Sequence, residues 1–129
     1  MKQKLFVVTG NTMKFNELFI GLSDFFICEQ KFFDSIEIQG KSEDIIKHKI
    51  ISAYEFFKQP VLVDDVSFHF AALNDFPGPY IKDFMKCFNP YEMGVKFLDS
   101  KVKAKCFLGF FDGKGEPVIV EGVVNGKVI

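Results

Sequence analysis

One short segment limits what this chain can fold into more than any other. The β-favouring run at residues 61–63, Val-Leu-Val, is followed at once by Asp64 and Asp65. The run predicts a strand buried on both faces, and two carboxylates cannot stay buried without partners. We therefore expect the strand to end there, with the acidic pair emerging at the sheet edge where open α/β sheets bind ligands. Paired carboxylates at such an edge suit Mg²⁺, which usually lies between protein carboxylates and substrate phosphates.

A second strand and turn occur near the N-terminus. Residues 4–8 form a short apolar strand, and the turn after it leads into an apolar spacing typical of one helix face. Asn11 or Thr12 can cap that helix, and Gly10 can adopt backbone conformations closed to other residues. A strand, a glycine turn and a helix start together direct free N–H groups at one place, the usual arrangement for binding anions. Lys14 places a cation in the first helical turn, where the dipole disfavours it, and this weakly indicates a phosphate.

Four segments follow one another along the chain: VTGNTMK at 8–14, EIQG at 37–40, VLVDD at 61–65 and FPGPYIK at 76–82. In order and approximate spacing they resemble the inosine triphosphate pyrophosphatase family, whose members hydrolyse non-canonical purine nucleoside triphosphates. The resemblance covers essentially the whole chain, and four ordered segments are far more specific than any one. It implies one domain over residues 1–129 with the α/β fold of that family.

This chain departs from the family pattern in two places. Family members usually continue past the point where this chain stops, with an aromatic-Gly-aromatic-Asp-Pro segment and a Ser-His-Arg motif. Neither is present, so we expect a domain that lacks the usual C-terminal segment: a naturally shortened relative, a truncated gene product or a fragment. The family also has Ser or Thr directly after the second acid, whereas this chain has Val66 followed by Ser67. The substrate contact made by that hydroxyl is therefore in doubt.

The remaining pattern predicts further helices and strands. In chain order these are a strand at 32–38, a helix from Ser42 that buries Ile46, Ile50, Ala53 and Phe57, a helix face at 81–88, a short helix at 91–98, and a hairpin of strands at 101–106 and 117–124. Helices early and a long C-terminal β-hairpin late favour a mixed, twisted α/β sheet with flanking helices.

Composition narrows the function classes. A net charge of −1 without a basic cluster argues against nucleic acid as a partner. Cys28, Cys87 and Cys106 lack C-x-x-C spacing, which suggests free thiols in a reducing compartment. His48 and His69 have no second ligand at metal-binding spacing and are expected to be structural. No signal-peptide pattern or membrane-length apolar run is present, so we expect a cytoplasmic protein without a membrane partner.

The resemblance also implies a cofactor, Mg²⁺, and a set of site residues. Glu37 and Asp65 are the implied metal ligands, and Asp64 is close enough to support either the metal or the water. Asp65 is further expected to orient and deprotonate the attacking water, since a bound metal acidifies that water. The residues expected to hold the triphosphate are Thr9, Gly10, Asn11, Lys14, Lys49 and Lys82.

Two functions remain open from the sequence. The first is Mg²⁺-dependent hydrolysis of non-canonical purine nucleoside triphosphates to a nucleoside monophosphate and pyrophosphate, with weakened base selection. The second is a shortened, non-catalytic nucleotide-binding or partner-dependent relative. In either case the resemblance implies a homodimer. Each candidate also has an ordinary interpretation: Asp64 and Asp65 as a turn after a strand, Glu37 as a solvated carboxylate, and Lys14 and Lys49 as surface lysines.

Overall fold

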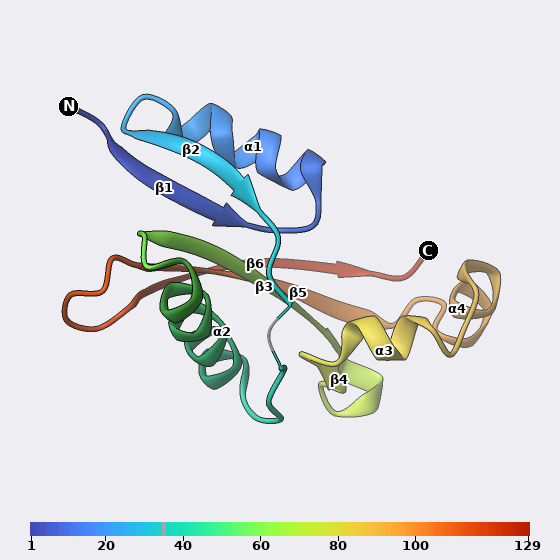
Figure 1. The fold of residues 1–129 in the computed structure, drawn as a ribbon. Coiled ribbons are helices and arrows are strands. Elements are labelled where there is room, and N and C mark those ends of the chain that lie inside the picture. Colours follow the sequence, from blue (N-terminus) through green and yellow to red (C-terminus); the bar gives the residue numbers. More distant parts are fainter. Residues whose placement is uncertain (35) are drawn as a thin grey trace. The chain divides into compact units, whose positions relative to one another are not determined.

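The structure of this protein is a computed structural model that describes residues 1–34 and 36–129. Its elements, in chain order (Figure 1), are β1 (Gln3–Val8), α1 (Thr12–Leu22), β2 (Phe26–Lys31), α2 (Ser42–Phe57), β3 (Val61–Phe70), the 3₁₀ turn η1 (Ala71–Leu73), β4 (Pro77–Gly78), α3 (Ile81–Met85), α4 (Pro90–Lys96), β5 (Lys101–Phe111) and β6 (Val118–Lys127). The chain forms two compact units, residues 1–64 with 108–120 and residues 65–107 with 121–129. No helix among the described residues has the length and apolarity that crossing a membrane requires.

In the first unit β1 is an inner strand with parallel neighbours on both sides. It pairs with β2 over six residues and with β3 through residues 61–63. The sheet order is β2-β1-β3-β5-β6, so β2 is an outermost strand. Residues 5–8 of β1 are all buried, as expected for a strand covered on both faces.

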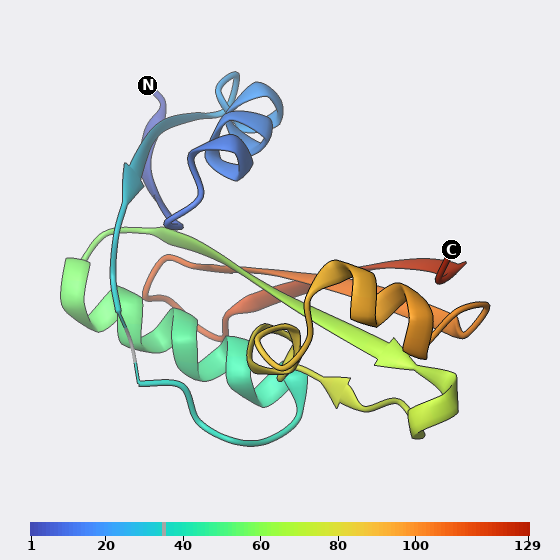
Figure 2. The same ribbon diagram turned by 90° about the vertical axis from the view of Figure 1, so that its right-hand side faces the viewer.

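The two helices of this unit cover opposite faces of its strands. Phe15, Leu18 and Leu22 of α1 pack against a buried cluster that includes Leu62. On α2, Ile50 lies within 3.1 Å of the position that a Cβ on Gly109 would take, and Val63 lies at the same place at 3.5 Å. Because successive strand residues face opposite sides, Leu62 and Val63 meet different helices. The ribbons of α1 and α2 lie on opposite sides of these strands (Figures 1 and 2).

The helix predicted from Ser42 is confirmed. It runs to Phe57, and the predicted residues Ile46, Ile50 and Ala53 are fully buried. Phe57, at the last turn, is only half-buried. An apolar stripe with this spacing is therefore a reliable guide to the buried face of α2.

The second unit has an aromatic core. Phe70, fully buried at the end of β3, has its ring centre 4.9 Å from that of Phe97 and 5.6 Å from that of Phe84. The short strand β4 pairs antiparallel with β3, which places Phe68 opposite Gly78. With parallel pairing around β1 and antiparallel pairing here, the sheet is mixed, as the sequence predicts.

The predicted strand at 32–38 is wrong. The strand lies earlier, at β2, and residues 32–34 and 36–38 have no regular structure; residue 35 is outside the described residues. An outermost strand tolerates polar side chains on both faces. The polar end of β2 therefore lacks the apolar pattern by which a strand is recognised in a sequence. The segment after β2 packs an apolar side chain on α2 instead: Phe33 stacks on Phe56, with ring centres 4.8 Å apart.

The prediction that the buried strand ends at the acidic pair is also wrong. β3 continues through Asp64 and Asp65 to Phe70, so the two carboxylates lie in mid-strand, each half-buried. The helix expected over 81–88 is shorter than predicted and ends at Met85. The short helix after it and the C-terminal hairpin are confirmed, and both hairpin strands, β5 and β6, are longer than expected.

Candidate functional site

The turn between β1 and α1 is held by its own side chains. Asn11 caps α1: its Oδ1 accepts a hydrogen bond from the backbone N–H of Lys14 at 3.2 Å. The backbone N–H of Asn11 in turn donates to Thr9 Oγ1 at 3.1 Å. The N–H of Thr9 donates to the carbonyl of Lys31 at 3.0 Å, which ties the turn to β2. Of the two caps expected from sequence, Asn11 is the one used, and the turn is held by hydrogen bonds among the protein's own groups.

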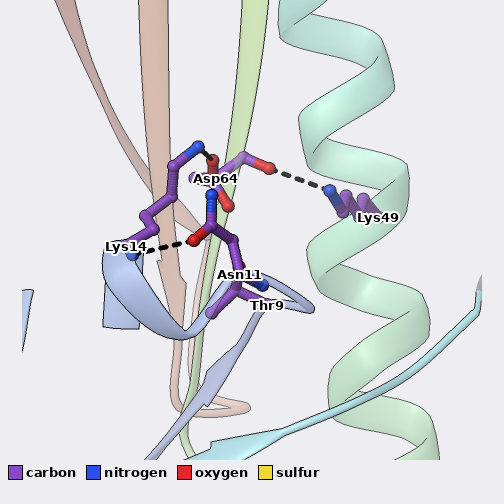
Figure 3. A network of polar contacts seen from close by, with 5 residues as sticks. All are labelled: Thr9, Asn11, Lys14, Lys49 and Asp64. Carbon is purple, nitrogen blue, oxygen red and sulfur yellow. Dashed lines mark hydrogen bonds and ion pairs between the residues drawn. The ribbon is translucent and has the colours of Figure 1, made fainter. Parts of the chain in front are cut away.

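An ion pair joins this turn to β3. The Nζ of Lys14 contacts the carboxylate of Asp64, a residue 50 positions later in the chain (Figure 3). The Lys14 side chain is 31% exposed and that of Asp64 only 12%, so the pair is shielded from water on the carboxylate side. The helix dipole disfavours a cation in the first turn of α1, and the Asp64 carboxylate compensates for this.

A second lysine reaches the same residue from the other helix. Lys49, on α2, donates from its Nζ to the backbone carbonyl of Asp64 at 2.8 Å (Figure 3). This contact is to a neutral acceptor, so it does not neutralise the lysine charge. Among residues 1–34 and 36–129, no carboxylate lies within ion-pair distance of Lys49. Its charge is therefore available to an anion.

These groups border a cavity of about 370 Å³ in the first unit. Its lining residues are Val8, Thr9, Gly10, Phe32, Phe33, Asp34, Lys49 and Asp64. Four of the residues predicted from sequence, Thr9, Gly10, Lys49 and Asp64, are therefore brought together. Asn11 and Lys14 are connected to them through the contacts described above. A polar turn after β1, a lysine from each of the two helices and a carboxylate of β3 form a typical setting for a phosphorylated ligand.

Four cavity residues were missed from the sequence: Val8 at the end of β1, and three consecutive residues after β2. Phe32, Phe33 and Asp34 line the cavity, but the incorrect strand at 32–38 gave no reason to turn them toward β1. Asp34 and Asp64 place two carboxylates on the cavity wall, and carboxylate oxygens are the ligands that Mg²⁺ prefers. The donor chemistry of the cavity thus fits a hard divalent cation, although no cluster of three metal-ligating side chains occurs among the described residues.

The other predicted site residues are not part of this cavity wall. Glu37 has an exposed side chain. Asp65 belongs to the second unit and is half-buried. Lys82, also in the second unit, is exposed in the first turn of α3. Their roles remain predictions.

Comparison with known proteins gives close matches over nearly the whole chain. The sequence profile of a family described as the Ham1 family matches residues 5–129. An inosine triphosphate pyrophosphatase of Schizosaccharomyces pombe is 34% identical over 98% of this chain and 70% of its own length. One of Tuber melanosporum is 39% identical over 100% of this chain and 73% of its own length.

Solved structures show the same fold. A HAM1 protein from Coxiella burnetii superposes with a TM-score of 0.80 at 20% identity, covering 97% of this chain and 72% of that one. A nucleoside-triphosphatase described as a dITP/XTP pyrophosphatase, from Mycobacterium abscessus, gives 0.76 at 20% identity, covering 96% of this chain and 73% of that one. This chain therefore spans roughly seven-tenths of each of these relatives.

Proposed function

The chain belongs to the Ham1 family, and we propose on this premise that it hydrolyses nucleoside triphosphates to a nucleoside monophosphate and pyrophosphate. Relatives at 34–39% identity are named inosine triphosphate pyrophosphatases, which favours non-canonical purine nucleotides as substrates. The observation that most supports the proposal is the convergence of Lys14 and Lys49 on Asp64 beside one cavity.

Binding of the triphosphate follows from the charges at this cavity. Lys49 has no carboxylate partner among the described residues and lies on the cavity wall, where it can neutralise phosphate oxygens. Gly10 lines the cavity with its backbone, and a Cβ there would lie 3.9 Å from the Phe32 ring, which lines the same cavity. The start of α1 adds the positive end of a helix dipole. These groups would hold the triphosphate together with Thr9 and Asn11. We propose Lys82 as a further triphosphate-binding residue.

The chemical step needs a positioned water and neutralised phosphates. When bound, Mg²⁺ would neutralise the triphosphate charge and acidify the attacking water. The residues proposed to hold it are Glu37, Asp64 and Asp65. Asp65 is further proposed to accept the proton of the water as it attacks phosphorus, with pyrophosphate leaving. Localisation in the cytoplasm and the formation of a homodimer remain predictions from the sequence.

Product analysis tests the proposal. The protein is incubated with Mg²⁺ and inosine, xanthosine, adenosine or guanosine triphosphate, and the products are separated by anion exchange. We expect monophosphate and pyrophosphate in equal amounts, and a loss of about a hundredfold or more in Asp65→Asn, because a charged group at the reacting centre is removed. The control is Asp83→Asn, which removes an exposed carboxylate paired with Lys86 at 3.9 Å.

Three results would contradict the proposal. Orthophosphate in place of pyrophosphate would mean that a different bond is cleaved. Equal activity in Asp65→Asn and Asp83→Asn would remove Asp65 from the reaction. The absence of monophosphate with every nucleotide at high protein concentration would place this chain among binding proteins without catalytic activity.

A further inference from the structure

The strand β6 is an outermost strand of the sheet. In the part of the chain that the structure describes, its only strand neighbour is β5 (Figures 1 and 2). Residues 120–127 are all exposed, so neither face of the strand is covered there. The sequence of β6 contains no proline, and residues 122–126 carry no charge. A strand border of this kind presents unpaired backbone N–H and C=O groups that can pair with another strand.

The middle of this border is apolar and open. Val124 is 70% exposed and Val123 46% exposed. Apart from adjoining residues, nothing in the described part of the chain lies within 4 Å of the position that a Cβ would take on Gly122 or Gly126. Because alternate residues of a strand share a face, these two glycines flank Val124 on its own face. The valine therefore has free space on both sides along the strand.

One charge lies at each end of this open stretch, and the two have opposite signs. Glu121 pairs with Lys105 of β5 at 3.7 Å, and its side chain is 38% exposed. Lys127 pairs with Asp99 at 3.9 Å, and its side chain is 64% exposed. Ion pairs that are open to water hold their members only weakly. Both groups can therefore accept a second partner of opposite charge.

We propose that β6 pairs antiparallel with the β6 of a second copy of this chain, with Val124 at the two-fold axis. In a two-fold antiparallel pair, the numbers of two facing residues always add up to the same value. With Val124 facing itself, Glu121 faces the partner's Lys127, and Lys127 faces the partner's Glu121. The two glycines of the open stretch face each other in the same way, so both valines at the axis keep their free space.

The charges select this register over its neighbours. With the axis at Val123 or Asn125, Glu121 and Lys127 would both face uncharged residues. With the axis at Glu121 or at Lys127, like charges would face each other, which destabilises a strand pair. The axis at Val124 is the one position that brings the two opposite charges of β6 together.

This register also continues the ion pairs already present. A row of alternating signs would run from Lys105 through Glu121 to the partner's Lys127 and the partner's Asp99. The surface is therefore complementary to itself in charge as well as in backbone pairing. The inference uses none of the residues of the candidate site, so it holds whether or not the chain hydrolyses nucleotides.

Two charge reversals test the register. Sedimentation velocity of the full chain over about a hundredfold range of concentration gives the dissociation constant of the dimer. We expect a weak wild-type dimer, since one strand border buries little surface. Glu121→Lys and Lys127→Glu should each raise the dissociation constant about ten-fold, because like charges then face each other at both ends of the stretch. In an equal mixture of the two variants, every facing pair is again opposite in sign, and association should return to near the wild-type strength.

Recovery in the mixture separates pairing between copies from effects on folding. In each variant the reversed group still lies beside its own neighbour of like charge, Lys105 or Asp99, and mixing does not change that. Circular dichroism melting checks each variant. Val124→Lys serves as a further variant that leaves both ion pairs intact, and its site is exposed enough to accept a lysine. It should weaken the dimer about ten-fold, since two lysines would face each other at the axis.

The turn between β5 and β6 offers matched controls. Glu116→Lys and Lys114→Glu change the net charge by the same amounts at exposed positions outside the open stretch. Glu116 also has a lysine partner, Lys47 at 3.6 Å, as Glu121 does. Alone or mixed, these variants should change the dissociation constant by about two-fold or less, because charges far from an interface are screened by salt.

Three results would overturn the proposal. The first is a wild-type chain that stays monomeric over the whole range of concentration. The second is a mixture of Glu121→Lys and Lys127→Glu that associates no better than either variant alone, or no better than the mixed controls. The third is a wild-type dimer that Val124→Lys leaves unchanged, because the border of β6 would then lie outside the interface.

Discussion

The turn after β1 and the turn after β3 are built from similar polar residues, but they use them in opposite ways. The first turn fixes its backbone through Thr9 and Asn11 and leaves the charges around it, on Lys49 and Asp64, at a cavity. In the second turn the polar groups form hydrogen bonds with one another. His69 has both ring nitrogens engaged, Nε2 with Ser67 Oγ at 2.8 Å and Nδ1 with the Asp75 carbonyl at 3.1 Å.

The second turn is also closed by its backbone. The N–H of Asp75 donates to the carbonyl of Phe70 at 2.9 Å, and the N–H of Phe70 donates to the carbonyl of Phe76 at 3.2 Å. Because a carbonyl can only accept, Nδ1 of His69 bears a proton, and in the neutral imidazole Nε2 then accepts from the fully buried Ser67 hydroxyl. The two turns thus differ in what their polar groups hold: the first fixes its own backbone beside a charged cavity, and the second fixes the imidazole ring of His69.

The largest expected effect is the difference in kcat/KM between two isosteric substitutions, Asp64→Asn and Asp75→Asn. Asp64→Asn should lower kcat/KM about a hundredfold, because it removes a carboxylate from the reacting site. Asp75→Asn should change it by about two-fold or less, since Asn tolerates the positive φ of 70° there and the carbonyl that holds His69 is kept. Steady-state pyrophosphate release measures both. Similar losses in the two variants would break the comparison.

A smaller effect is expected on stability at the second turn. His69→Phe should lower the free energy of unfolding by about 1–3 kcal/mol, because the buried Ser67 hydroxyl loses its acceptor. Urea unfolding followed by circular dichroism measures this, and kcat/KM at low temperature should stay near the wild-type value. In a double-mutant cycle, His69→Phe should cost less when Ser67 is already Ala. A large loss of activity without a loss of stability would mean that His69 takes part in the reaction.

The smallest expected effect is on stability and kcat/KM when either of two asparagine helix caps is replaced. Asn11 caps α1 in the first unit, and Asn89 caps α4 in the second, where its Oδ1 accepts from the N–H of Glu92 at 2.8 Å. Replacing either with Ala should cost about 1 kcal/mol of stability. Only Asn11→Ala should also lower kcat/KM, by about ten-fold, because the start of α1 is then misplaced. Equal kinetic losses in both variants would show that the cap acts through stability alone.

The sequence predicts most of the fold because local patterns decide it. The run at 61–63, the Asn11 cap and the stripe on α2 each depend on neighbours a few residues away, and all three are confirmed. The continuation of β3 was also visible in principle, since Phe68 and Phe70 alternate with polar residues after the acidic pair. The expectation that carboxylates end a strand outweighed that alternation, although half-buried positions accommodate them.

The arrangement of the candidate site could be predicted only in part. That Lys14 and Asp64 belong to one site follows from their motifs, but their direct contact depends on how α1 lies on the sheet. The contact of Lys49 with a backbone carbonyl has no sequence pattern at all. Asp34 was missed because its segment lacks regular structure, and in such segments periodicity says nothing about side-chain direction.

The polar outermost strand β2 also affects how copies of this chain meet one another in solution. Its Glu29 forms ion pairs with Lys4 and with Lys31, each at 3.6 Å, so both signs of charge line that border of the sheet. A border with fixed, mixed charges is a poor template for a further strand, because an incoming chain would have to strip water from all of them. The residues that hid β2 from the sequence reading thus disfavour the addition of a strand at the β2 edge of the sheet.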